Sequence, residues 1–459
     1  MDKKGVESFS RIMKHSNIVG IKLEKEVAPK VISQGEGIDP SELKEKSIPD
    51  ERNGIQYDLV DEKCKNVFWV THVKRGHFNK NFQKNLGELL FLKTHFPKIK
   101  CGIVLGKIKE NYRPEYEIAY RLLWDAVYVV ELKNGEWVYA SQKFEPDETD
   151  KQVAREILNK QLEKISKITN MPTFTRFCSF PSLIGSSGLS LAQSTFEKVS
   201  SLKLKEITPN LLKEVFEDLI EKWKKKGIEE NELKTFADGL TIDLLFDAIN
   251  GLLIYLSKKF PHYKISQLFK SNDWNGLLGL FPPRAQSSKF WDYYNPPEYL
   301  VERIVEDVTL EFAEKVQEIK GCPGGFPLST FLSDLGLNIQ FKEDIGIKLK
   351  NCKYIVIQVK ALSGGRGASG PKQAGYEAHR IAGLSFATRW NYNKSLGQIL
   401  EKPLNKIVVL DGYWKGPIEY NYPEKIFEYI YKFACVKGIF LIDQINQIKE
   451  CLRELLKSL

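Results

Sequence analysis

One short stretch, residues 341–360, constrains the fold more than any other part of the chain. It reads FKEDIGIKLKNCKYIVIQVK and contains an apolar, β-branched run of strand length at residues 354–359. Asp344 lies fourteen residues before Gln358, a distance that fits two adjacent antiparallel strands. Because side chains alternate along a strand, Gln358 and Lys360 should point the same way, with Val359 in the core. A carboxylate, an amide oxygen and an ammonium are therefore expected to meet at one sheet edge.

These three groups suit metal-assisted phosphodiester cleavage. Carboxylate and carbonyl oxygens hold Mg²⁺, and a lysine orients a water or stabilises the charge on the phosphorane. Asp344 and Gln358 are the expected metal ligands, and Lys360 is expected to position or activate the water. Glu343 is a candidate to substitute for Asp344 or to assist it. The alternative is a surface strand pair that carries ordinary charges.

The elements expected after Lys360 follow a regular order. A glycine-rich loop, LSGGRGASGP, contains Arg366 and leads into a helix that starts at Lys372. A strand at 406–412, a helix from Pro423 and a final strand at 438–443 follow. The expected order is strand, strand, helix, strand, helix, strand.

This order and the D-x13-Q-x-K pattern resemble the PD-(D/E)xK nuclease superfamily over residues 325–459. In that superfamily an acidic residue lies on the first strand and (D/E)xK on the second, with Gln an accepted variant of the middle position. The KQAGYEAHR helix and the VVLDGYW strand end are similar to those of bacterial type II restriction endonucleases.

The resemblance implies an α/β, restriction-endonuclease-like core, a central mixed sheet flanked by helices. It also implies Mg²⁺-dependent cleavage of double-stranded DNA by in-line attack of water, at a specific sequence and leaving 5′-phosphate ends. Arg366 and Lys372 are then expected to contact DNA. Glu377 and His379 are candidates to extend the ligand shell or to contact phosphate.

A second copy of this pattern is expected near the N-terminus. Asp58 lies fourteen residues before His72, and Lys74 is next but one. A helix at 82–96, a strand at 101–108, a helix at Pro114 and a strand from 126 then repeat the order of elements. We expect a duplicated α/β core, the alternative being two unrelated segments of similar order.

The second copy differs chemically at its central position. His72 is a poor partner for Mg²⁺, which prefers oxygen ligands. We therefore expect a degenerate copy that serves DNA binding, with Lys74 and Arg75 near a phosphate backbone. The alternative is a second active site in which Asp58 and Lys74 act with Glu88 of the following helix.

We expect the chain to contain four domains: an N-terminal arm at 1–50, the nuclease-like domain at 51–146, a mainly helical middle domain at 147–320 and the nuclease domain at 321–459. The arm contains a plausible strand at 17–23. In the middle domain we expect helices at 149–167, 208–226, 235–260 and 299–320. We expect DNA-facing loops at 180–194 and 274–294. Glu302, Glu306 and Glu311 of the last helix are candidates to add a carboxylate to the site.

Composition fits this interpretation without establishing it. The net charge of +9 and the pI near 8.9 suit a polyanionic partner such as double-stranded DNA. Seven cysteines without a CxxC pair indicate free, mostly buried thiols in a reducing cytoplasm. No signal-peptide core and no run near the ~18 apolar residues of a membrane span are present, so no membrane partner is expected. Two cores in one chain could imitate a dimer, or the intact copy could form a homodimer.

Two other functions stay open. A repair or recombination nuclease would read DNA structure instead of sequence, and a non-catalytic DNA-binding protein would have both cores degenerate. Discrete fragments from an intact plasmid would favour the sequence-specific enzyme. An absence of cleavage with Mg²⁺ or Mn²⁺ would favour the non-catalytic protein.

Overall fold

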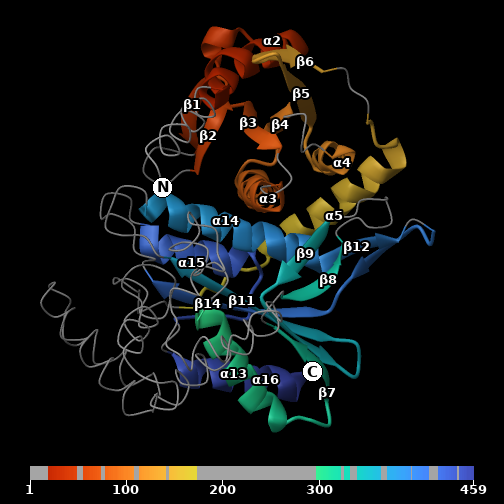
Figure 1. Ribbon diagram of the computed structural model, residues 1–459, viewed down its shortest axis with the longest axis vertical. Coiled ribbons are helices and arrows are strands. Elements are labelled where there is room, and N and C mark those ends of the chain that lie inside the picture. Colours follow the sequence, from red (N-terminus) through yellow and green to blue (C-terminus); the bar gives the residue numbers. More distant parts are fainter. Residues whose placement is uncertain are drawn as a thin grey trace, which may run out of the picture. The chain divides into compact units, whose positions relative to one another are not determined.

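The computed structural model shown in Figure 1 divides into two compact units. The first comprises 1–170, 329–341 and 379–401, and the second 171–328, 342–378 and 402–459. The structure describes residues 19–48, 55–73, 78–107, 113–140, 144–172, 296–321, 325–330, 339–362, 370–393, 395–412, 422–441 and 444–459. The expected helices 208–226 and 235–260, the loops 180–194 and 274–294, and Lys74, Arg75 and Arg366 lie outside these residues.

Six described strands of the first unit form one mixed sheet in sequence order. They are β1 Lys44–Ile48, β2 Ile55–Val60, β3 Asn66–Val73, β4 Lys100–Lys107, β5 Ala126–Lys133 and β6 Glu136–Tyr139. β1, β2 and β3 are antiparallel, β3, β4 and β5 are parallel, and β6 returns antiparallel. Parallel neighbours need crossovers, which helices α3 (Phe78–His95) and α4 (Pro114–Leu123) provide.

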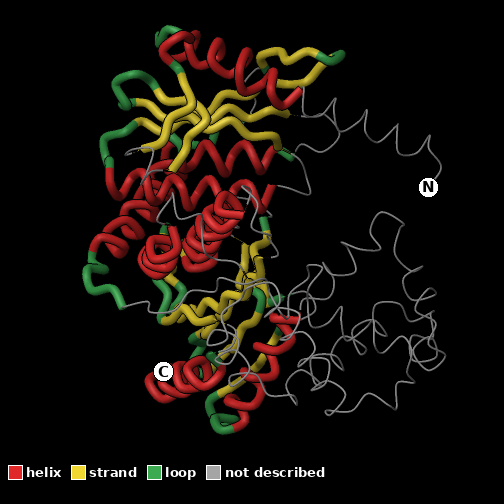
Figure 2. Tube along the Cα trace, turned by 90° about the vertical axis from the view of Figure 1, so that its left-hand side faces the viewer, coloured by secondary structure: helices red, strands yellow, loops and turns green. Residues whose placement is uncertain are grey.

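Helices cover both faces of this sheet, as Figures 1 and 2 show. The π-helix η1 (Leu23–Val27) and α2 (Ala28–Glu36) pack on Phe68, Val104 and Trp137. On the other face α3 and α4 bury a cluster of aromatic rings, and α5 (Glu148–Ser166) packs on these two helices. The core of the unit is therefore layered on both sides of the sheet.

Two glycines let helix α3 approach the end of helix α14 (Gly370–Arg389), where residues 379–389 belong to the first unit. A Cβ at Gly87 would lie 2.1 Å from the carbonyl oxygen of His379. A Cβ at Gly383 would lie 1.9 Å from the carbonyl oxygen of Gln83. Because neither distance is sterically allowed, both positions require glycine for this helix contact.

The described strands of the second unit form a five-stranded mixed sheet of order β15-β14-β11-β10-β7. They are β7 Val316–Lys320, β10 Ile345–Leu349, β11 Tyr354–Leu362, β14 Leu404–Gly412 and β15 Gly438–Leu441. Helices α13 (Pro296–Leu310) and α16 (Ile445–Ser458) pack together on one side, and α15 (Tyr422–Phe433) lies on the other (Figure 1). Two short two-stranded sheets, β8 Phe326–Thr330 with β9 Gln340–Glu343 and β12 Trp390–Asn393 with β13 Gln398–Glu401, complete the described strands.

Both large sheets have the same pattern of strand directions. β7, β10 and β11 are antiparallel and β11, β14 and β15 are parallel, as are their counterparts β1 to β3 and β3 to β5. For the strands of these two sheets the order strand, strand, helix, strand, helix, strand occurs twice, with the β12–β13 hairpin inserted between α14 and β14 in the second. The α/β class with mixed sheets and flanking helices is confirmed.

Two predicted elements differ from the structure. The strand expected at 17–23 is wrong, because the chain is helical from Val19 onward. Three side chains of this helical segment are fully buried: Leu23, Ala28 and Ile32. Their spacing of four to five residues is helical, so residues 19–48 contribute to the core instead of forming an arm. The helix expected at 299–320 ends at Leu310, and its last part is β7, whose residues pair with β10.

Two further expectations concern compartment. Across the described ranges, no helix is both long and apolar enough to cross a membrane. The described cysteines are free thiols, but of these only Cys101 is buried and Cys352 is exposed. The expectation of mostly buried thiols is therefore wrong for this part of the chain.

Candidate active site

The three residues singled out by the sequence lie together in the second unit. The register of β10 on β11 pairs Ile345 with Ile357, which places Asp344 opposite Gln358. Asp344 Oδ2 accepts a 2.7 Å hydrogen bond from the backbone N–H of Val359 and lies 3.6 Å from Lys360 Nζ. Asp344 therefore lies near Lys360 and across from Gln358 in the pairing, but in the bend directly before β10 and not on a strand as expected.

The expectation that this group lies at a sheet edge is wrong. β11 is the central strand of the five, with β10 on one side and β14 on the other. Its run of apolar residues on both faces is typical of a strand buried on both sides. Lys360 keeps 26% of its side chain exposed and Asp344 19%, whereas Gln358 is only 1% exposed.

Gln358 carries the most unusual atom of the site. Its side-chain Oε1 is buried and meets no hydrogen-bond donor among the described residues. A buried oxygen without a donor costs about 1–3 kcal/mol, and natural proteins contain few of them. An oxygen in this state, beside the carboxylate of Asp344, is suited to a cation ligand.

A fully buried ion pair adjoins these residues. Lys406 Nζ lies 2.8 Å from Glu343 Oε1, and neither side chain is exposed. Burial lowers the pKa of Lys406, while the charges of Glu343 and, more weakly, Asp344 act to raise it. Glu343 is therefore held by Lys406, not presented to solvent beside Asp344.

Lys406 is not among the site residues expected from the sequence. The signal was present, since a lysine occurs in the otherwise apolar strand KIVVL. A buried lysine requires a carboxylate partner, but which carboxylate depends on pairing across the sheet. Lys406 pairs with Val356 in parallel register and therefore lies on the same face as Gln358 and Lys360.

Charge on this face changes with depth. The pair Lys406 and Glu343 is fully buried. Along β11, Gln358 is the next residue on this face after Val356, the partner of Lys406, and it is also buried. Lys360, the residue after that on the same face, reaches solvent. Among the described residues no three His, Cys, Asp or Glu side chains converge on one point. A divalent cation would thus use Asp344 together with the amide oxygen of Gln358 and oxygens that are not side-chain carboxylates.

The aspartate of the first unit has the same backbone partner as Asp344. Asp58 Oδ2 accepts a 2.7 Å hydrogen bond from the N–H of Val70, and the pairing of Leu59 with Phe68 places Asp58 opposite Trp69. Trp69 therefore occupies the position of Gln358, and Thr71 that of Lys360. The predicted equivalence of His72 with Gln358 and of Lys74 with Lys360 is wrong.

Strand geometry explains this correction. Trp69 lies eleven residues after Asp58, so the first hairpin is three residues shorter than the second and equal spacing selects a different register. His72 belongs with Phe68 and Val70 on the opposite face of the strand. Its ring lies 5.7 Å from that of Trp137. Residues with equal spacing in sequence thus lie on opposite faces of the two sheets.

Polar groups near Asp58 come from helix α3. Trp69 Nε1 donates a 2.8 Å hydrogen bond to Glu88, and Lys84 Nζ lies 3.3 Å from the other oxygen of that carboxylate. Burial raises the pKa of Asp58 and of Glu88, and the charge of Lys84 opposes both shifts. The neutral forms of both acids are therefore favoured relative to exposed carboxyls.

Three further candidate residues, His379, Glu311 and Glu302, contact other parts of the protein. His379 is buried against α3, and burial together with the charge of Lys84 lowers its pKa to about 3. A neutral imidazole offers no positive charge to a phosphate. Glu311 is ion-paired with Arg453 at 2.6 Å, and Glu302 lies beside Gly321.

No protein-family model matches the chain, and no curated protein matches it. The function must therefore be argued from the residues and their arrangement.

Proposed function

We propose that the protein is a Mg²⁺-dependent endonuclease that cleaves double-stranded DNA at a specific sequence, in the manner of type II restriction enzymes. The observation that carries the proposal is the position of Asp344, directly before β10, near Lys360 and across from Gln358 of β11. The topology of the five-stranded sheet supports it, since β7, β10 and β11 are antiparallel and β14 pairs in parallel with β11 after the crossover helix α14.

Asp344 and Gln358 would hold the metal ion. Their oxygens match the preference of Mg²⁺, and the buried Oε1 of Gln358 has no donor among the described residues to compete with a cation. Bound Mg²⁺ would offset the charge of the scissile phosphate and lower the pKa of water. Lys360 would position the attacking water and stabilise negative charge that develops on the phosphate.

The cleavage step needs no protein nucleophile. Water attacks phosphorus in line with the leaving 3′ oxygen, the phosphorus–oxygen bond to that oxygen breaks, and the products carry a 5′-phosphate and a 3′-hydroxyl. Lys360 lies between the buried polar groups and solvent, where a phosphate could approach it. The backbone hydrogen bond of Val359 fixes Asp344 beside it.

A non-catalytic DNA-binding protein is the second candidate. It is favoured by the ion pair that removes Glu343 from solvent, which leaves Asp344 as the partly exposed carboxylate of this group. A site with one such carboxylate binds divalent cations more weakly than one with two.

The deciding experiment is digestion of supercoiled plasmid by the full chain with Mg²⁺. We expect discrete fragments, no cleavage by Asp344→Asn, and stabilisation by Mg²⁺ of only the unsubstituted chain, about 2.7 kcal/mol at one hundred times the Kd. An absence of cleavage with both Mg²⁺ and Mn²⁺ would support the non-catalytic protein. Cleavage without discrete fragments would support a structure-specific nuclease, and normal cleavage by Asp344→Asn would exclude this site.

A further inference from the structure

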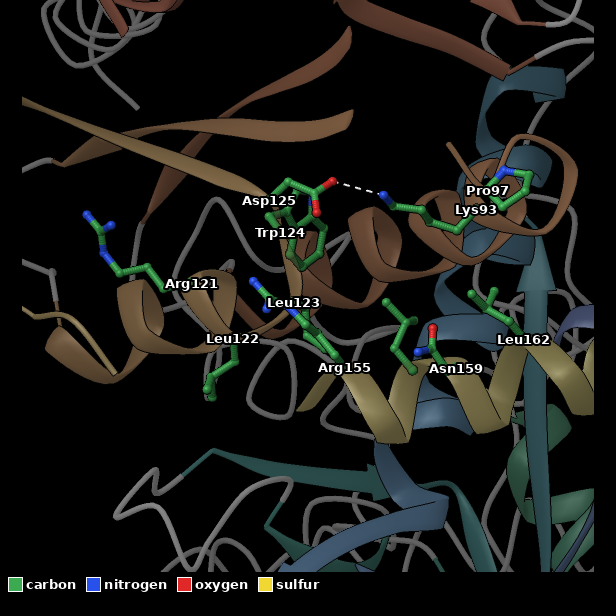
Figure 3. A pocket seen from close by; sticks show the side chains of 11 residues that line it. Lys93, Pro97, Arg121, Leu122, Leu123, Trp124, Asp125, Arg155, Asn159 and Leu162 are labelled. Carbon is green, nitrogen blue, oxygen red and sulfur yellow. Dashed lines mark hydrogen bonds and ion pairs between the residues drawn. The ribbon is translucent and has the colours of Figure 1, made fainter. Parts of the chain in front are cut away.

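A cavity of about 230 Å³ lies in the first unit, apart from the residues of the proposed active site. It is formed by the end of α3, the end of α4 and one face of α5, as Figure 3 shows. Lys93 and Pro97 precede β4 and Asp125 directly precedes β5, so the cavity lies at the amino ends of two parallel strands. Nothing in the proposed cleavage reaction uses it.

Two of the cations that line the cavity have carboxylate partners. Lys93 Nζ lies 2.9 Å from Asp125 Oδ2 and 2.7 Å from the carbonyl oxygen of Ile99. Asp125 also accepts a hydrogen bond from the backbone N–H of Cys101. Arg121 is buried and ion-paired with Glu117 at 2.8 Å and with Glu145 at 3.1 Å. These groups form a rigid, charge-balanced frame.

Arg155 is the third cation that lines the cavity, and no carboxylate of the described residues forms an ion pair with it. It is exposed on α5 and extends toward Leu123 and Trp124 in Figure 3. In the described part of the chain no ion pair or hydrogen bond joins it to another side chain, although its charge acts weakly on Glu148. Asn159, four residues later, lies on the same helix face and also lines the cavity.

Trp124 lines the cavity beside Arg155 with a buried indole. Its side chain is 5% exposed and lines the cavity, and its Nε1 finds no acceptor among the residues that the structure describes. Buried indole N–H groups usually have a partner. The other walls are apolar, formed by Leu122, Leu123 and Leu158. A cation without a carboxylate partner, the amide of Asn159 and an apolar wall therefore line the same small volume.

We propose that this cavity binds a small organic anion, with a phosphomonoester or carboxylate head at Arg155 and Asn159 and a flat apolar body against the leucines. A guanidinium matches both heads because it donates two parallel hydrogen bonds. A cationic ligand would meet three positive side chains and one carboxylate that already has two partners. The volume is below the ~300 Å³ of usual ligand pockets, so the ligand is a single ring in size.

The test is calorimetric titration of the full chain with three probes that separate head from body. Phenyl phosphate has both, inorganic phosphate has the head alone, and benzamidine combines the same ring with positive charge. We expect phenyl phosphate to bind at least about tenfold more tightly than inorganic phosphate, since each 1.4 kcal/mol of ring burial is tenfold. Benzamidine should not bind. Benzoate, run in parallel, decides between a carboxylate and a phosphate head.

Substitutions locate the binding. Arg155→Gln should weaken the binding of phenyl phosphate about tenfold or more, because it removes a charge-assisted pair of hydrogen bonds. Arg155→Lys should recover only part of that loss, since lysine cannot form the paired contact. Lys160→Gln removes the same charge from a neighbouring exposed position of α5 that does not line the cavity, and should leave the affinity unchanged.

The proposal is overturned if neither phenyl phosphate nor benzoate binds at millimolar concentration. It is also overturned if Arg155→Gln and Lys160→Gln weaken binding equally, which would show attraction to the helix charge alone. DNA cleavage by Arg155→Gln is expected to be unchanged. Failure of the cleavage assay on the unsubstituted chain would leave the titration result standing, so the two proposals fail separately.

Discussion

Each large sheet holds an aspartate in the same structural position, and the surroundings of the two aspartates differ. Asp58 and Asp344 each accept a backbone hydrogen bond of 2.7 Å from a valine on the neighbouring strand. In each case that strand continues into a helical crossover and a parallel partner. With these anchors, the side chains around each aspartate can be compared position by position.

The positions across from the aspartates differ in polarity. Gln358 and Lys360 in the second unit correspond to Trp69 and Thr71 in the first. Trp69 fills its position with an indole that contacts the ring of Tyr57 edge-on, with 5.3 Å between centroids. An aromatic ring leaves no oxygen for a metal, and a hydroxyl cannot replace an ammonium beside a phosphate.

The buried ion pair is also confined to one sheet. Glu343 and Lys406 correspond to Tyr57 and Cys101, both nearly or fully buried. Burial raises the pKa of the Cys101 thiol to about 12, so this position carries no charge. The same scaffold therefore supports a hydrophobic packing layer in one unit and a charged layer in the other, which makes a single reactive site the expected arrangement.

The largest expected effect is on the buried pair. Lys406→Met leaves the carboxyl of Glu343 buried without its partner, which should lower the free energy of unfolding by about 3–5 kcal/mol. Urea denaturation measures this. Lys449→Met removes a lysine from a partly exposed pair with Asp307, at 3.4 Å, and should cost about 1 kcal/mol or less.

A double variant separates the pair from its surroundings. Glu343→Leu combined with Lys406→Met replaces both charges with apolar groups and should recover most of the lost stability. Recovery with loss of cleavage would show that the pair serves the active site. Equal stability of Lys406→Met and Lys449→Met would contradict the burial of Lys406.

The second effect compares corresponding positions in the two sheets. Lys360→Ala should slow plasmid cleavage by about 10²- to 10³-fold, the usual cost of removing one group that stabilises transition-state charge. Thr71→Ala should leave the rate nearly unchanged. Gel separation of supercoiled, open-circular and linear plasmid measures both.

The same gel tests whether the first sheet is inactive. If Thr71→Ala accumulates open circles while Lys360→Ala also nicks, each sheet cuts one strand and the comparison fails. Full linearisation by Thr71→Ala at the normal rate would support one reactive site per chain. DNA binding by Lys360→Ala, measured separately, should persist because the fold does not depend on this partly exposed side chain.

Local patterns predicted the elements well because they carry their own signals. The order of strands and helices on both sides of the two aspartates follows from apolar periodicity and from helix starts such as Pro114. The shared face of Gln358 and Lys360 also follows from alternation along one strand. These features depend on neighbours close in sequence.

Features that depend on strand register could not be predicted in this way. The spacing of Asp58 to His72 equals that of Asp344 to Gln358. Because the first hairpin is shorter, however, Trp69 and not His72 occupies the position of Gln358. One residue of shift turns a side chain to the other face. The partner of Lys406 was hidden for the same reason, because Glu343 lies sixty-three residues away in the sequence and only sheet pairing brings it near.

The smallest expected effect concerns the acid beside Trp69. Burial raises the folded-state pKa of Glu88 above its ordinary value of 4.5, so folding favours its protonated form. Between 4.5 and the raised folded pKa, the folded chain binds more protons than the unfolded chain, and stability falls as pH rises. Above the folded pKa the whole penalty is present. Glu88→Gln removes this contribution and should flatten the decline.

The glutamine retains an oxygen for the indole of Trp69 but loses the charge that attracts the partly exposed Lys84. Urea denaturation from pH 4.5 to 8 should therefore show a change in how steeply the free energy of unfolding falls with pH, more than a change in its maximum value. Part of the slope should persist, because burial also raises the pKa of Asp58. Glu156→Gln, an exposed position on α5, should leave the slope unaltered. A steeper decline in Glu88→Gln would mean that its carboxylate is favoured in the folded state, and the first sheet would then hold a charged acid beside Asp58 as a working site requires.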